Sequence, residues 1–231
     1  MREGEVIKLC KGCDTNPADK GHWGYCLDCF VEGRKLRYPQ EFTREEERYV
    51  YGSILGDGGL RKNGLFSYFR KARKSSLEIS LQAEAVVLTR FHPHLHPLQV
   101  NGFPQVTLTT GSAWVIDEVR KQCYREGVKV VTLEMLNKID EQGLTYWYQD
   151  DGSYHSTKHY IDLCTQSFSF GEHELMVKWF RNTFDLWPII TRQMGKTEML
   201  YHLRFHNTEA RKFLEIVKPY IHPNFIYKLG A

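Results

Sequence analysis

The sequence predicts an α/β or α+β protein built from two related units, and three observations support this. Helix-like and strand-like segments are mixed throughout residues 41–231. Two apolar stretches, YVYGSILGDGGL at residues 49–60 and LTYWYQDDGSY at residues 144–154, each predict a helix that ends at an Asp-Gly pair. Their acids, Asp57 and Asp151, are 94 residues apart, and the elements that follow them recur in the same order. The sequence contains no GxGxxG or Walker motif, which argues against a parallel nucleotide-binding sheet.

The first 40 residues are predicted to form a separate small module. The segment CKGCDTNPADKGHWGYCLDC contains two C-x2-C pairs, formed by Cys10, Cys13, Cys26 and Cys29. Paired cysteines at this spacing are typical of tetrahedral zinc ligation, and four protein ligands leave no open position for a substrate. We therefore expect a structural Zn²⁺ rather than disulfides. The expected domains are a zinc-binding module at 1–40, a first unit at 41–142 and a second unit at 143–231.

Composition excludes some classes and leaves nucleic acid as a partner. The 231 residues carry a net charge of +3, with 42% hydrophobic residues. Neither a signal peptide nor an apolar run long enough for a bilayer is present, so we expect an intracellular protein without a membrane partner. Basic residues are concentrated between residues 61 and 74, where there is no acid, and in RKLR at 34–37. We expect these side chains to bind phosphates: Arg61, Lys62, Arg70, Lys71, Arg73, Lys74, Arg34, Lys35 and Arg37.

The elements of the first unit follow from local patterns. Thr43 and Glu46 fit a capping box, so a helix is expected to begin there and to end near Gly56. Residues 61–76 predict an exposed basic hairpin. Residues 77–82 alternate apolar and polar side chains, which predicts a half-buried strand. The remaining segments predict a helix at 83–95 broken by a proline, a strand at 104–110, and a helix at 112–127 closed by a glycine.

The second unit repeats this order. After the acid-ended helix we expect a strand at 159–166, a helix at 171–184, a strand at 199–207 and a helix at 208–221. The segment YHLRFH at 201–206 alternates an aromatic and apolar face with a basic face. A strand of this kind can bury its apolar face and present the other to a DNA groove. The residues expected on that second face are His202, Arg204 and His206.

The two acid-ended helices suggest one shared metal site. The small residues Gly52 and Gly56 would let the backbone of a second helix come close. If the helices pack together, Asp57 and Asp151 meet at their C-terminal ends, where the helix dipole adds to the repulsion between carboxylates. Mg²⁺, which prefers oxygen ligands, would relieve that repulsion. The alternative is that each Asp-Gly pair is only a turn that ends a structural helix.

These stretches resemble the paired motifs of the LAGLIDADG homing endonucleases, in the monomeric form with two motifs in one chain. Aligned on the terminal Asp-Gly, the motifs are Val50–Gly58 and Leu144–Gly152. The segments LCTQSFSFGEHELMVKWF and VKPYIHPNFIYKL are similar to the second-half pattern of this family, so the resemblance covers residues 45–228. One departure is that Tyr146 stands where the first motif has Gly52. Either Tyr146 points outward or the two helices lie further apart.

The resemblance implies a fold and an activity. The fold is two αββαββα units related by a pseudo-twofold axis, whose antiparallel sheets form a saddle over a long, asymmetric double-stranded DNA site. The activity is Mg²⁺-dependent hydrolysis of both strands by a monomer that a mobile intron or a free-standing homing gene encodes. The same scaffold serves as an intron RNA maturase, and a non-catalytic DNA-binding regulator is a further alternative.

The resemblance also implies the site residues by position. The Mg²⁺ ligands are Asp57 and Asp151, with the main-chain carbonyls of Gly56 and Asp150. The Asp150 side chain is expected to be a solvated turn acid. The remaining catalytic residues are a lysine near the end of each half and a polar residue that organises water: Lys129, Lys228 and Gln166.

Two segments lie outside the motifs. The histidines of HPHLHP at 92–97 would suit a metal-dependent phosphatase, but without helical spacing they are better explained by an irregular surface turn. The zinc-binding module is expected to be either an arm that contacts DNA through the basic residues at 34–37 or a passive cap on the first sheet.

Overall fold

The structure, a computed structural model, describes residues 9–13, 15–18, 25–64, 66–197 and 199–230, apart from the side chains of residues 34–36. Two halves follow the same element order, αββαββα, as expected. The first comprises α2 (Arg44–Leu55), β1 (Gly59–Asn63), β2 (Phe66–Lys74), α3 (Glu78–Val87), β3 (His94–Val100), β4 (Phe103–Thr109) and α4 (Trp114–Cys123). The second comprises α6 (Glu141–Asp151), β7 (Gly152–His155), β8 (Tyr160–Leu163), α7 (Phe170–Phe184), β9 (Ile189–Met194), β10 (Met199–His206) and α8 (Asn207–Val217).

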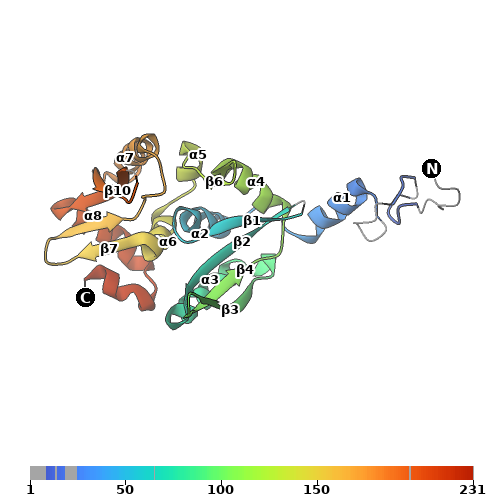
Figure 1. Ribbon diagram of the computed structural model, residues 1–231, viewed down its shortest axis with the longest axis horizontal. Coiled ribbons are helices and arrows are strands. Elements are labelled where there is room, and N and C mark those ends of the chain that lie inside the picture. The colour runs from blue at the N-terminus through green and yellow to red at the C-terminus, as the bar shows by residue number, and fades with distance from the viewer. Residues whose placement is uncertain (1–8, 14, 19–24, 65, 198, 231) are drawn as a thin grey trace.

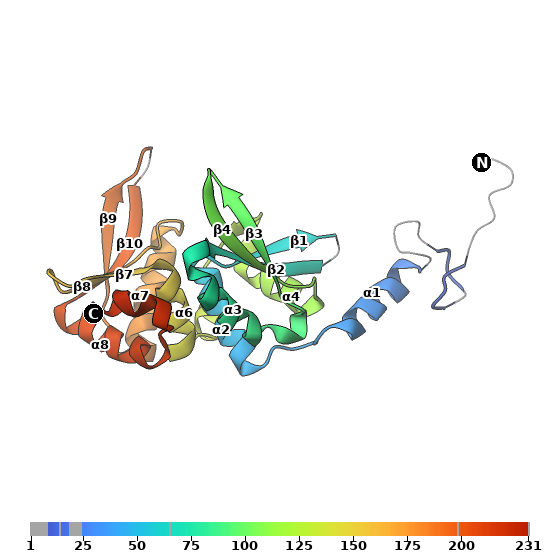
Figure 2. The same cartoon turned by 90° about the horizontal axis from the view of Figure 1, so that it is seen from below.

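The two sheets have the same topology. Their strand orders are β1-β2-β4-β3 and β7-β8-β10-β9, and all the pairs are antiparallel. The hairpins β3–β4 and β9–β10 stand on the same side of the molecule, with helices α2, α3, α6 and α8 below them (Figure 2). The duplicated α+β fold predicted from the sequence is therefore confirmed. The expected boundary at 142/143 falls inside α6, which begins at Glu141.

Shorter elements join and close the halves. A hairpin of β5 (Tyr124–Arg125) and β6 (Val128–Lys129) and the single turn α5 (Leu133–Leu136) connect the first half to the second. The chain ends in the 3-10 helices η3 (Lys218–Tyr220) and η4 (Pro223–Leu229). Buried apolar side chains of both halves belong to one cluster, so the halves share a core. In the part of the chain that the structure describes, no helix combines the length and apolar character needed to cross a bilayer.

The segment after the first hairpin differs from expectation. A strand was expected at 77–82, but residues 78–87 form helix α3, in which Ser80, Leu81 and Glu84 are buried while Ile79 is 65% exposed. Burial thus follows a helical period, and the alternation of apolar residues in the sequence is coincidental. The HPHLHP segment, expected to be an irregular turn, leads into strand β3, and His94 pairs with Thr109.

Helix α2 begins as the sequence predicts. The Thr43 hydroxyl accepts the Glu46 N–H at 3.2 Å, and the Glu46 carboxylate accepts the Thr43 N–H at 2.7 Å. We expect Thr43→Ala to lower the free energy of unfolding by about 1 kcal/mol, because one helix-end amide loses its partner. Urea unfolding measures this, with the exposed turn residue Thr157 replaced by Ala as the control. Equal stability of both variants would contradict the capping role.

The N-terminal module lies apart from the two sheets. Helix α1 (Leu27–Arg37) extends away from the first half, and a short connection leads from it to α2 (Figures 1 and 2). The described part of the module therefore does not cover the first sheet, which argues against the passive cap, one of the two expected alternatives.

Candidate active site

Helices α2 and α6 pack against each other at the centre of the molecule (Figure 1). A Cβ added at Gly52 would lie 2.2 Å from the carbonyl oxygen of Gly143, so the glycine permits the close approach that the sequence suggested. On the other side of this contact, the rings of Tyr49 and Tyr146 meet edge to face, with centroids 4.9 Å apart. Tyr146 therefore packs between the halves and neither points outward nor separates the helices.

This packing brings together the ends of α2 and α6, where the two predicted acids stand. Asp57 follows the C-cap of α2, and Asp151 is the last residue of α6. Burial and the nearby carboxylates of Asp57 and Asp150 raise the pKa of Asp151 to about 7. Burial and the charge of Asp150 also raise the pKa of Asp57. Burial and repulsion between the carboxylates thus oppose ionisation of both acids, and a divalent cation bound to their oxygens would favour the charged forms.

Each half places one lysine beside the residue that precedes its acid. Lys129 on β6 donates from Nζ to the Gly56 carbonyl oxygen at 2.9 Å. Lys228 on η4 donates from Nζ to the carbonyl oxygens of Gln149 at 2.8 Å and Asp150 at 3.3 Å. Burial lowers the pKa of both lysines. The two predicted lysines therefore occupy similar positions in the two halves, within reach of the predicted carbonyl ligands.

The side chain of Asp150 differs from expectation. It is fully buried rather than solvated, and its Oδ2 accepts the backbone N–H of Asp57 at 3.2 Å. Lys71 and Arg73 form ion pairs with it, at 2.8 Å and 2.6 Å. These two basic residues were predicted to bind DNA, but their side chains are at most 3% exposed and face the helices. That prediction is wrong because both side chains form buried ion pairs with Asp150, an acid from the other half that is remote in sequence.

The chain matches the model of the LAGLIDADG DNA endonuclease family over residues 48–213. It belongs to this family. The probable intron-encoded DNA endonuclease 3 of Mycosarcoma maydis is 32% identical over 95 residues, which cover 41% of this chain and 67% of that protein. Protein RecA of Mycolicibacterium flavescens is 25% identical over 228 residues, which cover 90% of this chain and 52% of the relative, so the chain spans about half of its length.

A solved structure has the same fold. The homing endonuclease I-WcaI bound to its DNA recognition sequence matches with a TM-score of 0.72 and 21% identity, over 87% of this chain and 92% of that one. This likeness confirms the fold. The family expected from the two motifs is confirmed by the family model, and α2 and α6 are the LAGLIDADG helices.

The open face of the first LAGLIDADG sheet carries three of the predicted basic contacts. Residues on opposite positions of neighbouring strands share a face, which places Arg61 with Tyr68 and Arg70 with Thr109. Lys74 is on the same face, and Lys62 is exposed at the edge. The register also adds residues that sequence reasoning missed. The alternation of β3 and β4 would have identified them, had β3 been recognised: His94, His96, Gln105 and Thr109.

The open face of the second sheet contains its own acid. His202, Arg204 and His206 alternate with the apolar residues of β10 as predicted, and His206 is exposed. The Arg204 guanidinium, however, makes two hydrogen bonds to Asp162, at 2.6 and 2.8 Å. His202 is only 7% exposed, and burial lowers its pKa. His202 is therefore not placed to contact DNA, and the expectation for this residue is wrong.

Four predicted residues remain, one near the helix ends and three in the N-terminal module. The side chain of Gln166 interacts with the thiol of Cys164. The backbone N–H of Cys164 donates to the main-chain carbonyl of Asp151 at 3.0 Å, so Gln166 is linked to the backbone of the second acid through Cys164. Arg37 is exposed at the end of α1. The side chains of Arg34 and Lys35 lie outside the described residues.

The four cysteines of the N-terminal module come together as predicted. One ligand atom from each of Cys10, Cys13, Cys26 and Cys29 lies within 4.8 Å of the other three. The sulfur atoms of Cys13 and Cys26 are 3.9 Å apart. A tetrahedron of Zn–S bonds near 2.3 Å separates its sulfur atoms by about 3.8 Å, so the donor set fits zinc.

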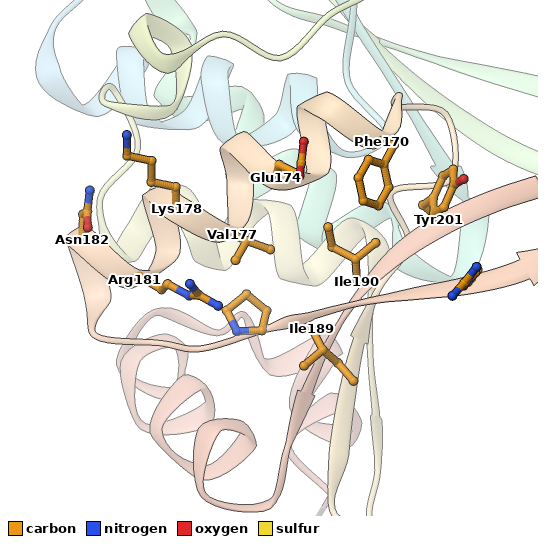
Figure 3. Close-up of a pocket in the computed structure, with 11 residues that line it drawn as sticks. Phe170, Glu174, Val177, Lys178, Arg181, Asn182, Ile189, Ile190 and Tyr201 are labelled. Atoms are coloured by element: carbon orange, nitrogen blue, oxygen red, sulfur yellow. The ribbon is translucent and has the colours of Figure 1, made fainter.

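A groove lies away from these sites, between α7 and β9. Its volume is about 970 Å³, and Phe170, Val177 and Ile190 line it together with basic side chains such as Arg181 (Figure 3). None of the acids or lysines at the LAGLIDADG helix ends lines this groove. The candidate active site is therefore the pair of helix ends rather than this hollow.

Proposed function

We propose that this chain is a site-specific DNA endonuclease that cuts both strands of a long, asymmetric site with a divalent metal, Mg²⁺. The observation that carries the proposal is that Asp57 and Asp151, one acid from each half, stand at the ends of two packed helices, where burial and the nearby Asp57 raise the pKa of Asp151. A lysine is hydrogen-bonded to the carbonyl of the residue that precedes each acid. A site that only bound nucleic acid would gain nothing from two carboxylates that repel each other and repel phosphate.

The residues divide the work as follows. Asp57 and Asp151 would hold the metal through carboxylate oxygens, together with the carbonyls of Gly56 and Asp150. A metal bound there would neutralise charge and lower the pKa of water. Lys129 and Lys228 bring positive charge to the place where negative charge develops on a phosphate under attack. Gln166 orients water beside the second acid.

The open faces of the two sheets bind the duplex. Arg61, Arg70 and Lys74 hold phosphates at the first sheet, while His96 and His206 lie where a strand can reach base edges. Lys62 adds charge at the sheet edge. Asp162 accepts two hydrogen bonds from Arg204. This arginine therefore contacts DNA only if it leaves the carboxylate and binds a base or a phosphate instead.

The experiment is cleavage of a supercoiled plasmid that carries the DNA flanking the gene, with any intron removed. We expect a linear product cut at one locus in the presence of Mg²⁺. Tight binding without cutting would contradict the proposal and favour a regulator. Binding to the intron transcript but not to this DNA would contradict it in favour of a maturase. The sequence of the linear ends gives the position of both cuts.

We also propose that the cysteine module holds one Zn²⁺ and acts as a DNA-contacting arm, as its place beyond the first sheet and the basic residues at 34–37 support. Metal analysis should find one zinc per chain. Removal by a strong chelator should weaken DNA binding by about tenfold, since several phosphate contacts are lost, with no change in the melting temperature of the two halves. Cys13→Ser should act in the same way. Unfolding of the halves on chelation, or unchanged binding, would contradict the arm.

A further inference from the structure

A network of four buried charges lies directly behind the candidate metal site. We infer that Lys71, Arg73, Glu84 and Asp150, named here the four-charge network, position the Asp57 carboxylate for metal binding. Glu84 comes from α3 and the two basic residues from β2, while Asp150 comes from the second LAGLIDADG helix. The inference rests on the proposed function, because it assumes that Asp57 is a metal ligand.

The charges are balanced and closely held. Lys71 Nζ lies 2.8 Å from Asp150 and 3.1 Å from Glu84, and Arg73 reaches each acid at 2.6 Å. All four side chains are at most 5% exposed. Ser53 and Tyr49 on α2 add hydrogen bonds to Lys71 and Glu84, at 3.1 and 3.0 Å. The network is therefore rigid and is anchored on α2 as well as on the sheet.

One oxygen links the network to the metal site. Oδ2 of Asp150 accepts the Asp57 N–H at 3.2 Å, and the same oxygen forms the ion pair with Lys71. The backbone before Asp57 touches this carboxylate, since a Cβ added at Gly56 would be 2.7 Å from Oδ2. Lys71 and Arg73 thus fix the carboxylate of Asp150, and this carboxylate in turn binds the backbone N–H of Asp57. A shift in Asp150 would move the first acid relative to the second.

The second half has the same fold, and its described residues form no such network at the corresponding positions. Gly59 pairs with Arg70 on the first sheet, and Ser153 pairs with Asp162 on the second. With the motifs aligned on their Asp-Gly pairs, Leu163 therefore stands where the first half has Lys71. The residue equivalent to Arg73 in this alignment is Thr165.

An arrangement without acid–base ion pairs therefore exists in this fold, with Leu163 at one position and Thr165, which is hydrogen-bonded to His173 at 2.8 Å, at the other. Buried ion pairs seldom stabilise more than apolar side chains of similar size, because desolvation offsets their attraction. Stability alone accordingly does not explain four charges at this place, whereas the orientation of Asp57 does. Residues behind the ligands of a metal orient those ligands, and their loss typically weakens metal binding about 10- to 100-fold.

The test is Mn²⁺ binding to the full chain, measured by titration calorimetry on the zinc-loaded protein without DNA. Asp57→Asn should abolish binding at the helix ends. Asp150→Asn and Lys71→Met should each raise the Kd for Mn²⁺ about tenfold. The control is Asp117→Asn, which changes a buried acid that bonds Ser67 at 2.7 Å outside the network. It should leave the Kd unchanged.

The Lys71→Met variant separates positioning from simple electrostatics. Removing a positive charge near a cation site strengthens cation binding if charge alone matters, whereas loss of the Asp150 anchor weakens it. Weaker binding supports the inference, and equal or tighter binding overturns it. If Lys71→Met does not fold, the double variant Asp150→Asn/Lys71→Met replaces it, because the ion pair of Arg73 and Glu84 remains and the net charge is unchanged. Weaker Mn²⁺ binding by this variant supports the inference, and equal or tighter binding overturns it.

Cleavage distinguishes this inference from the proposed function. A wild-type chain that binds Mn²⁺ through Asp57 but cuts no DNA would refute the endonuclease and leave the positioning role supported. A chain that cuts DNA while Asp150→Asn keeps the wild-type Kd and single-turnover rate would refute the positioning role alone. Retention of Mn²⁺ binding in Asp57→Asn would also overturn the inference.

Discussion

Asp151→Asn is expected to abolish double-strand cleavage, with the single-turnover rate falling at least about 10³-fold. The acid from the second half is replaced by a neutral side chain of the same shape, so the metal loses a charged ligand worth several kcal/mol in the transition state. Binding of the same DNA in EDTA should be equal or tighter, because a negative charge facing the phosphates is removed. Gel assays of both strands measure the rate, and filter binding measures affinity.

The same variant has a signature in stability. Burial and the neighbouring acids raise the pKa of Asp151 from 3.8 to about 7 in the fold. The folded state therefore binds more protons than the unfolded state between about pH 4 and pH 7, and its stability falls as pH rises through that window. In EDTA, Asp151→Asn should melt at a higher temperature than the wild type at pH 8 and at a similar temperature below pH 4.

Two controls make this result specific. Asp57→Asn should also abolish cleavage, since each half contributes one acid. Asp185→Asn, at the exposed C-cap of α7, should leave the cleavage rate unchanged. Cleavage of both strands at more than a tenth of the wild-type rate by Asp151→Asn would rule out the assigned role of this acid.

Gly52→Ala is expected to destabilise the protein by about 3 kcal/mol or more, because the added methyl group would meet the Gly143 carbonyl at 2.2 Å. Backbone cannot give way as a flexible side chain does, so the two LAGLIDADG helices must separate. Separation also moves Asp57 away from Asp151, and cleavage should fall together with stability. Urea unfolding gives the free energy change, and plasmid cleavage at low temperature gives the activity of the folded fraction.

The matched control is Gly171→Ala in α7, where an added Cβ would meet nothing within 4 Å. Alanine is the better helix former there, so that variant should be as stable as the wild type or slightly more stable. A Gly52→Ala variant of wild-type stability would mean that the helices do not approach as closely as described.

Sequence reasoning identified the features that repeat. The capping box at Thr43, the two Asp-Gly helix ends and the lysines at similar distances after each acid are local or periodic signals, and the structure places them as expected. The features that sequence reasoning missed depend on contacts with residues that are remote in the sequence. Lys71 and Arg73 have the composition of an exposed basic strand, and only the buried Asp150, from the other half, explains why they turn inward.

The error at residues 77–82 has a similar origin. Alternating apolar residues predict a strand, but Ser80 and Glu84 are buried because the Arg73 guanidinium needs acceptors. A periodicity argument that assigns every buried position to an apolar residue therefore fails at this helix. Glu84 in the otherwise apolar segment AEAVVL was the available signal, since a lone acid on such a helix predicts a buried cation nearby.

The contact between α2 and α6 makes the two halves non-interchangeable. When the motifs are aligned, Gly52 corresponds to Tyr146 and Tyr49 corresponds to Gly143, yet glycine meets glycine and tyrosine meets tyrosine across the contact. Two copies of either half would instead set glycine against tyrosine on both sides. The contact surfaces of the two halves therefore fit each other, whereas two copies of the same half would fit poorly. A chimaera that joins one half to that of a relative must transfer these four positions as a set.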